Sequence, residues 1–454
     1  MAARQFRFAH MADAHVGAWS RDPGLRRGLL SSVLEALETV RRERCEFLLL
    51  SGDTFHTPVP DPSEAAPLAR AFRSLQADGI RIYAIFGSHD YLFGKTSWLD
   101  VLSEGGLFQR VAREESPQEG TRWTLPFLRD GPTGAVLAGV SGRAQGLDRR
   151  AFDDMDPSDF TAQRGTRIFL FHAAVEEFLP PHLRGYVPGV PQDLLPEGCA
   201  YYAGGHIHVT YEGKGPGGGP LVNPGAVFGT SRTDLANVAQ GSTRAGVVIV
   251  DVVDGRAVPR WHVTTRADRF RVMDIDVDGL SASEAVARIR TEMEDLRPQG
   301  AHLLPRVRGL LRQGTFQDLD LGSVEKDLRR EGATSVRFDV NELTTPSEGP
   351  GAPGEDPGVP TDGEARILQA LTRAISGTDV PPEFQGEKGL SRARELLVSL
   401  GIPPAEGEAR TDYVEKRLEI ALRWVGIEVP AGSPGNALRS PEDSPPAHHR
   451  GRLP

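Results

Sequence analysis

The first part of the chain switches repeatedly between two hydrophobic periods. Residues 6–11 alternate apolar and polar side chains as a strand does, whereas leucines and valines in residues 24–42 recur at helical spacing. The run Phe47 to Leu50 is wholly apolar and has the length of a buried strand. A second helix is predicted over 68–75, with its end at Gly79, and a β-ribbon over 245–263. Further strands are predicted at 80–86, 135–141, 167–172, 200–204 and 219–222. Strands interleaved with helices predict an α/β layered domain over residues 1–266.

A smaller unit is predicted to follow at residues 267–345. Strand-like runs at 272–277, 303–311 and 335–340 surround a helical stripe at 281–293. This mixture predicts a small α+β domain.

The pattern breaks at residues 346–363, which hold five prolines and five glycines. Such a segment cannot form a packed core and is typical of a flexible linker. Helical periodicity returns over residues 364–428, which predicts a short helical module. The last residues, 429–454, are rich in glycine, proline and serine, and we expect a disordered tail.

Composition narrows the class of protein. Of the 454 residues, 39% are hydrophobic, which is enough for a packed core, and the formal net charge of −10 excludes a wholly basic nucleic-acid coat but not a local basic groove. Two cysteines exclude a disulfide scaffold and a cysteine-based zinc site. The chain has no apolar run long enough to span a membrane and no hydrophobic segment at its start that would act as a secretory signal. We therefore expect a cytoplasmic protein.

Polar side chains that can hold a metal ion follow one predicted strand after another. They come in a fixed order along the chain: Asp13 and His15; Asp53 and His56; Ser88, His89 and Asp90; His172; His206 and His208. In open α/β sheets, ligands bind at the carboxyl ends of the strands. We therefore expect these five strand ends to meet at one place.

The spacing of these residues suits metal binding. Residues i and i+2 of an extended chain point the same way, so Asp13 and His15 can hold one ion, and His206 and His208 can face a common cleft. Mixed carboxylate and imidazole ligands suit Mn²⁺, Fe²⁺ or Zn²⁺ better than Ca²⁺. A carboxylate such as Asp53 can bridge two ions, and such a pair can bind a phosphate and deprotonate a water.

Each motif alone has an ordinary explanation. An Asp-x-His sequence arises by chance in many chains, a Gly-Asp pair after a strand is usually a turn, and a lone His172 would be a buried histidine with its hydrogen bonds satisfied. The complete ordered set, with each member at a strand end, outweighs these explanations.

The ordered series resembles the signature of the calcineurin-like metallophosphoesterases. With the segment Gly52 to His56, the segment Leu99 to Leu102 and the sequence Asn223-Pro224-Gly225-Ala226, it is similar to the SbcD-type nucleases of DNA double-strand-break repair. These are the bacterial and archaeal counterparts of the eukaryotic meiotic recombination nuclease. The resemblance covers residues 5–265 by motif and residues 267–345 by position and size.

The resemblance implies a four-layer α/β/β/α sandwich. It further implies that residues 267–345 form a capping domain that binds double- or single-stranded DNA. Residues 364–428 would dock on an SbcC-type coiled-coil ABC ATPase; the alternative is that they form a self-contained helical bundle. A homodimer is also implied, with either Leu29, Leu30 and Leu37 or the 96–104 helix at its interface, although both stretches are equally good core faces. The location would then be cytoplasmic and nucleoid-associated.

The resemblance also implies roles for the site residues. Asp13, His15 and His208 would hold a first Mn²⁺, Asp53 would bridge, and His172 and His206 would hold a second; Mg²⁺, Fe²⁺ and Zn²⁺ are the alternatives. Ser88 stands where the family usually has an asparagine ligand of the second metal, so we expect a weaker or water-bridged second site. For catalysis, His89 would protonate or stabilise the leaving 3′ oxygen, Asp90 would orient the His89 ring, and His56 would lie beside the phosphate.

The resulting expectation is a Mn²⁺-dependent DNA exonuclease or endonuclease that acts by a two-metal mechanism. Two alternatives stay open. The same core motifs permit a phosphodiesterase or phosphatase that acts on a small molecule, and Ser88 permits an architectural subunit that binds DNA ends with weakened catalysis.

Overall fold

The computed structural model describes residues 5–345, apart from 92–95, 112–121, 143–147, 181–186, 188, 267–268 and 295–297. All of the described residues belong to one compact unit, Met1–Glu348. The predicted linker 346–363, helical module 364–428 and tail 429–454 lie outside the described residues. No helix of the described part is long and apolar enough to cross a membrane.

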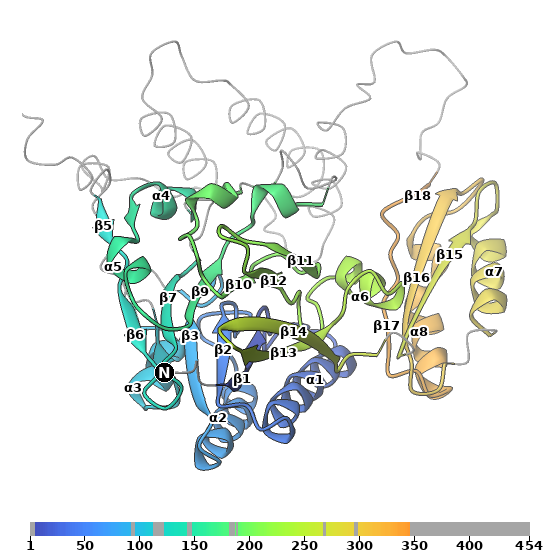
Figure 1. The fold of residues 1–454 in the computed structure, drawn as a ribbon. Coiled ribbons are helices and arrows are strands. Elements are labelled where there is room, and N and C mark those ends of the chain that lie inside the picture. The colour runs from blue at the N-terminus through green and yellow to red at the C-terminus, as the bar shows by residue number, and fades with distance from the viewer. Residues whose placement is uncertain are drawn as a thin grey trace, which may run out of the picture. The chain divides into compact units, whose positions relative to one another are not determined.

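The first of two large sheets has six strands in the order β14-β13-β1-β2-β3-β4 (Figure 1). Its parallel part consists of β1 (Phe6–Met11), β2 (Phe47–Ser51), β3 (Arg81–Ile85) and β4 (Gln109–Arg110). The predicted ribbon is present as β13 (Gly246–Val253) and β14 (Arg256–Val263), antiparallel to each other, with β13 antiparallel to β1. The helices α1 (Pro23–Arg42), α2 (Pro62–Ala77) and α3 (Trp98–Glu104) connect the parallel strands.

The second large sheet also has six strands, in the order β11-β12-β10-β9-β7-β6. The parallel strands are β7 (Val136–Val140), β9 (Arg167–His172), β10 (Tyr201–Gly205) and β12 (Pro220–Asn223), and the antiparallel edges are β6 (Phe127–Arg129) and β11 (Tyr211–Lys214). The short elements around this sheet are α4 (Asp148–Asp153), α5 (Ser158–Thr161), the 3₁₀ turns η2 (Glu176–Phe178) and η4 (Gln192–Leu194), and the strand pair β5 (Trp123–Thr124) and β8 (Met155–Asp156).

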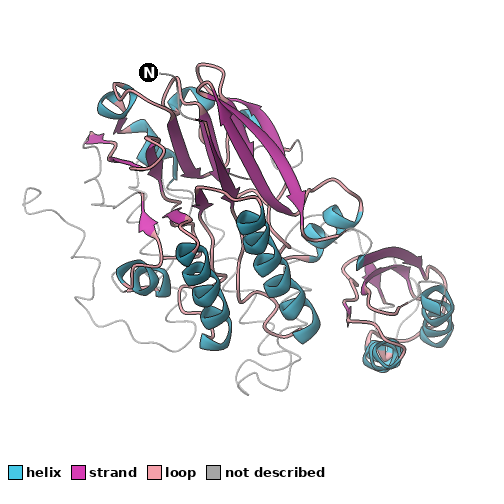
Figure 2. Ribbon diagram, turned by 60° about the horizontal axis from the view of Figure 1, so that its bottom comes forward, coloured by secondary structure: helices cyan, strands magenta, loops and turns pink. Residues whose placement is uncertain are grey.

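Alternate residues of the central strands pack into different layers. In β2, Phe47 and Leu49 pack with residues of the second sheet, whereas Leu48 and Leu50 pack with α1, α2 and α3. The far face of the second sheet is covered by residues of α4 and α5, including Phe160. Because β2 is buried on both faces, its sequence is continuously apolar. The predicted four-layer α/β/β/α order is therefore present, with α1 and α2 side by side on the first sheet (Figures 1 and 2).

The helices begin at clear capping signals. The carboxylate of Asp22 accepts hydrogen bonds from the backbone N–H groups of Gly24 and Leu25, and proline occupies the first position of α1. Helix α2 begins at Pro62 in the same way, after Asp61. It therefore starts six residues before the predicted boundary of 68, because the capping sequence precedes the first apolar position.

Residues 270–344 form a separate four-stranded sheet, which we call the cap sheet. Its strands are β15 (Phe270–Asp276), β16 (His302–Leu310), β17 (Ser335–Val336) and β18 (Leu343–Thr344), and its helices are α7 (Ala282–Glu294) and α8 (Leu321–Arg330), with a 3₁₀ turn η6 (Gln317–Leu319). The sheet has its own core, in which Ile289, Leu303 and Val307 are buried. Phe270 and Leu304 instead join the core beneath the first large sheet.

Four helices were not predicted from the pattern: the short α4 and α5, α6 (Arg232–Ala239), which precedes β13, and α8. In α8, Leu321, Val324 and Leu328 recur at helical spacing, but the helix has only 10 residues and buries only Val324 and Leu328, so its pattern is short. The strand predicted over 335–340 is only two residues long, and the rest of that segment carries isolated contacts such as the bridge between Arg306 and Asp339.

Candidate metal centre

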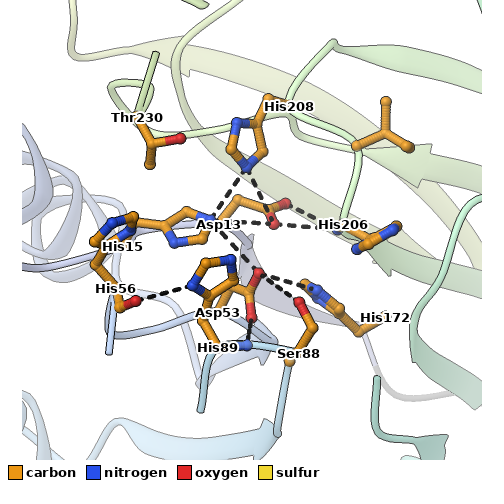
Figure 3. A network of polar contacts seen from close by, with 12 residues as sticks. Asp13, His15, Asp53, His56, Ser88, His89, His172, His206, His208 and Thr230 are labelled. Atoms are coloured by element: carbon orange, nitrogen blue, oxygen red, sulfur yellow. Dashed lines mark hydrogen bonds and ion pairs between the residues drawn. The ribbon is translucent and has the colours of Figure 1, made fainter. Parts of the chain in front are cut away.

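The predicted site residues follow the carboxyl ends of five parallel strands from two sheets. Asp13, Asp53 and Ser88 come after β1, β2 and β3 of the first sheet. His172 ends β9 of the second sheet, and His206 follows β10. The two groups of loops meet because the backbone N–H of His206 donates to the carboxylate of Asp13, and the hydroxyl of Ser51 donates to the carbonyl of Ala203 across the sheets. Figure 3 shows the resulting cluster.

The backbone at the centre is held in a sparsely populated conformation. Asp13, His15, Asp53 and His206 have φ angles of 50°, 44°, 50° and 95°. Non-glycine residues rarely adopt positive φ, and such strain concentrates at functional sites. Four of the eight described non-glycine residues with positive φ therefore lie at this centre.

Asp13, His15 and His208 form the first group of potential ligands. The Nε2 atoms of His15 and His208 are 3.1 Å apart, and each lies 4.0 Å from Oδ1 of Asp13. Their ligand atoms all lie within 4.8 Å of one another. This is the grouping that the sequence predicted for a first cation.

Asp53 lies between this first group and the second. One of its oxygens, Oδ2, is 3.5 Å from Nε2 of His15 and 3.3 Å from Nε2 of His172. The hydroxyl of Ser88 is 3.5 Å from the same oxygen. The His206 ring lies against the His172 ring, with centroids 5.1 Å apart. Asp53 therefore occupies the position expected of a bridging carboxylate.

His56 and His89 flank the first group. Their rings are stacked with centroids 5.2 Å apart, and ligand atoms of His15, His56 and His89 lie within 4.8 Å of one another. His89 is exposed, whereas Asp13, His15, Asp53 and His172 are buried. His89 is thus the residue of this centre that a substrate can reach most easily.

The prediction that Asp90 orients the His89 ring is wrong. Nδ1 of His89 donates instead to the carbonyl oxygen of His56, at 2.8 Å. The buried Asp90 carboxylate accepts hydrogen bonds from the backbone N–H groups of Thr54, Phe55 and Gly87. Asp90 therefore ties the loop after β2 to the loop after β3 and acts on the site through the backbone.

Several imidazoles are oriented in the same way. Nδ1 of His172 donates to the carbonyl of Ser51 at 2.8 Å, and Nδ1 of His208 donates to Oδ2 of Asp234 at 2.9 Å. Each hydrogen bond keeps a proton on Nδ1 and directs Nε2 at the centre, where it can act as a ligand once a cation is bound. Metal-binding histidines in proteins are usually held by such partners.

Burial and mutual charge set the protonation of these side chains when no cation is bound. Burial lowers the pKa of His206 to about 4, with the charge of His172 as the second cause. Burial also favours a neutral His172, but Asp53 outweighs it and raises the pKa of His172 to about 10. Burial raises the pKa of Asp53, but His172 and His15 outweigh it and hold that pKa below the usual range. Without a cation, a proton on His172 thus balances the charge of Asp53.

The residues present fit divalent cations. Two unprotonated imidazole nitrogens of His15 and His208 that face each other repel unless a cation or a proton lies between them. The buried Nε2 of His172 lies 3.3 Å from Oδ2 of Asp53, so a nitrogen donor and the shared carboxylate oxygen face the same place. Carboxylates and imidazoles together provide the donor set that Mn²⁺, Fe²⁺ and Zn²⁺ accept.

Close approach of the loops depends on glycine at two positions. A Cβ atom at Gly87 would lie 2.1 Å from Oδ1 of Asp53, and one at Gly52 would lie 2.3 Å from Nδ1 of His172. Any other residue would displace these side chains.

Two residues that support the site were not recognised from the sequence. Asp234, in the first turn of α6, binds His208, and the side-chain amide of Asn223 donates to the carbonyls of Ile207 and Val209. The sequence Ser231-x-x-Asp234 is a helix-start signal, but its contact with His208 spans 26 residues and has no local signature. Two further buried histidines, His10 and His302, hydrogen-bond to the hydroxyls of Tyr201 and Ser335 rather than to residues of this centre.

The chain is similar to one known protein over most of its length and to others over about half of it. No family model matches the chain. The DNA double-strand break repair protein Mre11 of Methanopyrus kandleri is 24% identical over 433 residues, which cover 88% of each chain. Mre11 of Methanococcus maripaludis is 25% identical over 203 residues, which cover 44% of this chain and 51% of the relative. The uncharacterized metallophosphoesterase YhaO of Bacillus subtilis is 27% identical over 213 residues, which cover 44% of this chain and 48% of the relative.

Among solved structures, a dimetal phosphatase from Danio rerio is 13% identical and covers 59% of this chain with a TM-score of 0.36, which is too low to support an argument. Four of the relatives found by sequence are DNA double-strand break repair proteins named Mre11. The chain is therefore similar in sequence to several Mre11 DNA double-strand break repair proteins and to a metallophosphoesterase, in agreement with the resemblance that its motifs indicated.

Proposed function

We propose that the chain is a metal-dependent DNA nuclease that hydrolyses phosphodiester bonds by a two-metal mechanism, with Mn²⁺ as its metal. One observation carries the proposal: the Asp53 carboxylate lies within 3.5 Å of His15 on one side and of His172 on the other. A shared carboxylate with separate imidazoles on either side is the arrangement that two neighbouring cations require.

The ligand assignment follows the family resemblance, and the groups around Asp13 and Asp53 support it. Asp13, His15 and His208 would hold the first cation, and His172, His206 and Ser88 the second, with Asp53 shared between them. A bound pair of cations supplies charge for the phosphate and lowers the pKa of a water that attacks it. The chain's own contribution is to hold the donors with their Nε2 atoms directed inward.

His89 is proposed as the proton donor to the leaving 3′ oxygen. Its Nδ1–H is engaged by the His56 carbonyl, so its other nitrogen is free to face a substrate at the exposed edge of the centre. The stacked His56 ring limits rotation of His89 and would lie beside the phosphate. A well-positioned general acid typically contributes about 10²–10⁴-fold to the rate.

DNA is the proposed substrate because one repair-protein relative matches over 88% of this chain, and because the cap sheet adds a second surface beyond the metal centre. An SbcC-type ATPase is the proposed partner. We further propose a homodimer that uses α3, in which Val101 is 53% exposed. In the alternative interface through Leu29, Leu30 and Leu37, Leu29 and Leu37 are buried in the core and Leu30 is partly buried, which favours α3.

The test is Mn²⁺-dependent degradation of linear duplex DNA by the full chain, with and without the ATPase. His89→Ala should lower the rate by about 10²–10⁴-fold while the protein still binds Mn²⁺. His262→Ala is the matched control, because His262 lies on β14 and contacts Glu43 rather than the centre. A wild-type protein that degrades no DNA with Mn²⁺, Mg²⁺, Co²⁺ or Fe²⁺ would overturn the proposal.

Two further measurements separate the alternatives. Turnover of a nitrophenyl phosphodiester without any binding of DNA would indicate a small-molecule phosphodiesterase. One Mn²⁺ per chain without hydrolysis would indicate an architectural subunit in which Ser88 fails to complete the second site.

A further inference from the structure

We propose that Asp234 is a positioning residue for His208, and that helix α6 links this ligand of the first cation to the cap sheet. The proposal rests on the function proposed above. It concerns the site of the first cation and assigns a role to residues that are not themselves ligands.

The Asp234 carboxylate holds the His208 ring from outside the centre. Its Oδ2 atom accepts the Nδ1–H of His208 at 2.9 Å and the backbone N–H groups of Thr230 and Ser231 at 2.8 and 3.0 Å. The side chain is only 14% exposed. Because an ionised carboxylate accepts hydrogen bonds but donates none, Nδ1 of His208 carries the proton and Nε2 is left as the ligand atom. Figure 3 shows His208 with this nitrogen directed at Asp13.

The same helix is anchored to the cap sheet two residues earlier. One terminal nitrogen of Arg232 lies 3.2 Å from the Asp339 carboxylate, and the other donates to the backbone carbonyl of Leu304 at 2.7 Å. The Arg232 and Asp339 side chains are each only 16% exposed, so solvent screens this ion pair weakly. A displacement of the cap sheet would therefore move the first turn of α6, and Asp234 lies in that turn.

A second contact from the cap sheet region reaches the other segment of the first cation site. The Arg337 guanidinium lies 5.7 Å from the ring centre of Trp19, and the Trp19 indole N–H donates to the carbonyl of Gly229, in the loop that leads into α6. Trp19 belongs to the segment between His15 and α1. The segment that follows His15 and helix α6, which holds His208 through Asp234, thus both touch the region of the cap sheet.

The first experiment measures Mn²⁺ binding to the full chain by titration calorimetry and electron paramagnetic resonance. Asp234→Ala should weaken one of two sites by about 10–100-fold and leave the other unchanged. Asp234→Asn should give an intermediate loss, because the amide oxygen still accepts but carries no charge. Melting temperatures check folding, and the Asn variant carries the test if the Ala variant does not fold.

Ser231→Ala is the matched control. It removes the other half of the same capping box, the hydrogen bond from the Asp234 backbone N–H to the Ser231 hydroxyl, and leaves the contact with His208 intact. Equal weakening of Mn²⁺ binding by Ser231→Ala and Asp234→Asn would show that only helix stability matters and would overturn the positioning role. Unchanged binding in Asp234→Ala would do the same.

The second experiment tests the link to the cap sheet by comparing Arg232→Gln with Arg306→Gln. Both arginines contact Asp339, but Arg306 lies on β16. We expect several-fold weaker Mn²⁺ binding at the first site in Arg232→Gln alone. Equal effects of the two variants, or none, would overturn the link. A wild-type chain that binds no Mn²⁺ would instead overturn the proposed function, so the two failures are distinguishable.

Discussion

At the scale of single residues, the centre is packed so tightly that one methyl group should disrupt it. Gly87→Ala would place a Cβ atom 2.1 Å from Oδ1 and 2.3 Å from the backbone nitrogen of Asp53. Because Asp53 has no room to retreat without losing its contact with His172, we predict at least about tenfold weaker Mn²⁺ binding and a comparable fall in nuclease rate.

Gly131→Ala is the control for this prediction, since a Cβ atom there meets nothing within 4 Å. Titration calorimetry of both variants gives the comparison. Binding by Gly87→Ala as tight as that of the wild type would show that the loop can move aside.

The sequence identified the residues of the centre better than their roles. The order Asp13, His15, Asp53, His172 was informative because carboxyl ends of parallel strands converge whatever the rest of the chain does. The role of Asp90 was predicted wrongly, because the direction of its side chain depends on the turn between Gly87 and Asp90 and not on its position next to His89.

At the scale of elements, the start of α1 carries a prediction about stability. The Asp22 carboxylate caps the helix through the N–H groups of Gly24 and Leu25, and its second oxygen lies 3.5 Å from Arg329, near the end of α8. Asp22→Ala should lower the free energy of unfolding by about 1–2 kcal/mol, because it removes a buried helix cap and leaves Arg329 without this partner.

Urea unfolding measures this loss, with Asp61→Ala as the comparison. Asp61 caps α2 through the N–H of Ser63, but it is exposed, so we expect a smaller loss there. A loss in Asp22→Ala no greater than that in Asp61→Ala would contradict the prediction.

Elements were predictable where burial is strong. The run Phe47 to Leu50 indicated β2 because both faces of that strand are buried, and the spacing in residues 24–42 indicated α1 because one face packs into the core. Helices α6 and α8 escaped prediction because few of their side chains enter a core.

At the scale of the whole molecule, one histidine between the sheets makes stability depend on pH. His10 of β1 is fully buried and hydrogen-bonds through its two ring nitrogens to the Tyr201 hydroxyl and the Gly204 carbonyl of the second sheet. Burial lowers its pKa to about 3. In the unfolded chain this imidazole takes up a proton below about pH 6.5, whereas in the folded chain it stays neutral until about pH 3.

Stability supplied by His10 is therefore present above pH 6.5 and is lost as the pH falls toward 3. Between pH 7 and pH 5 the titration of this one group should lower the free energy of unfolding by about 2 kcal/mol. The measurement is urea unfolding at both pH values with the metal chelated. His10→Gln keeps a donor and an acceptor but does not titrate, so its pH dependence should be weaker than that of the wild type by this amount. Parallel pH profiles would refute the assignment.

The arrangement of the whole molecule was predictable only in part. The four layers followed from the family resemblance, but the pairing of β13 with β1 joins residues more than 230 positions apart and has no signal in either strand alone. The contact of Phe270 and Leu304 with the core beneath the first sheet is equally invisible in the hydrophobic pattern.

The origin of the ligands in two separate sheets has a mechanical consequence. Asp13, His15 and Asp53 come from one sheet, and His172, His206 and His208 come from or follow the other. Ions held between them would act as cross-links through the middle of the sandwich, comparable in effect to covalent staples. Detachment of one sheet from its neighbour and release of the ions would then be a single event, so the loaded protein should resist heat and proteases in a way that the stripped protein does not.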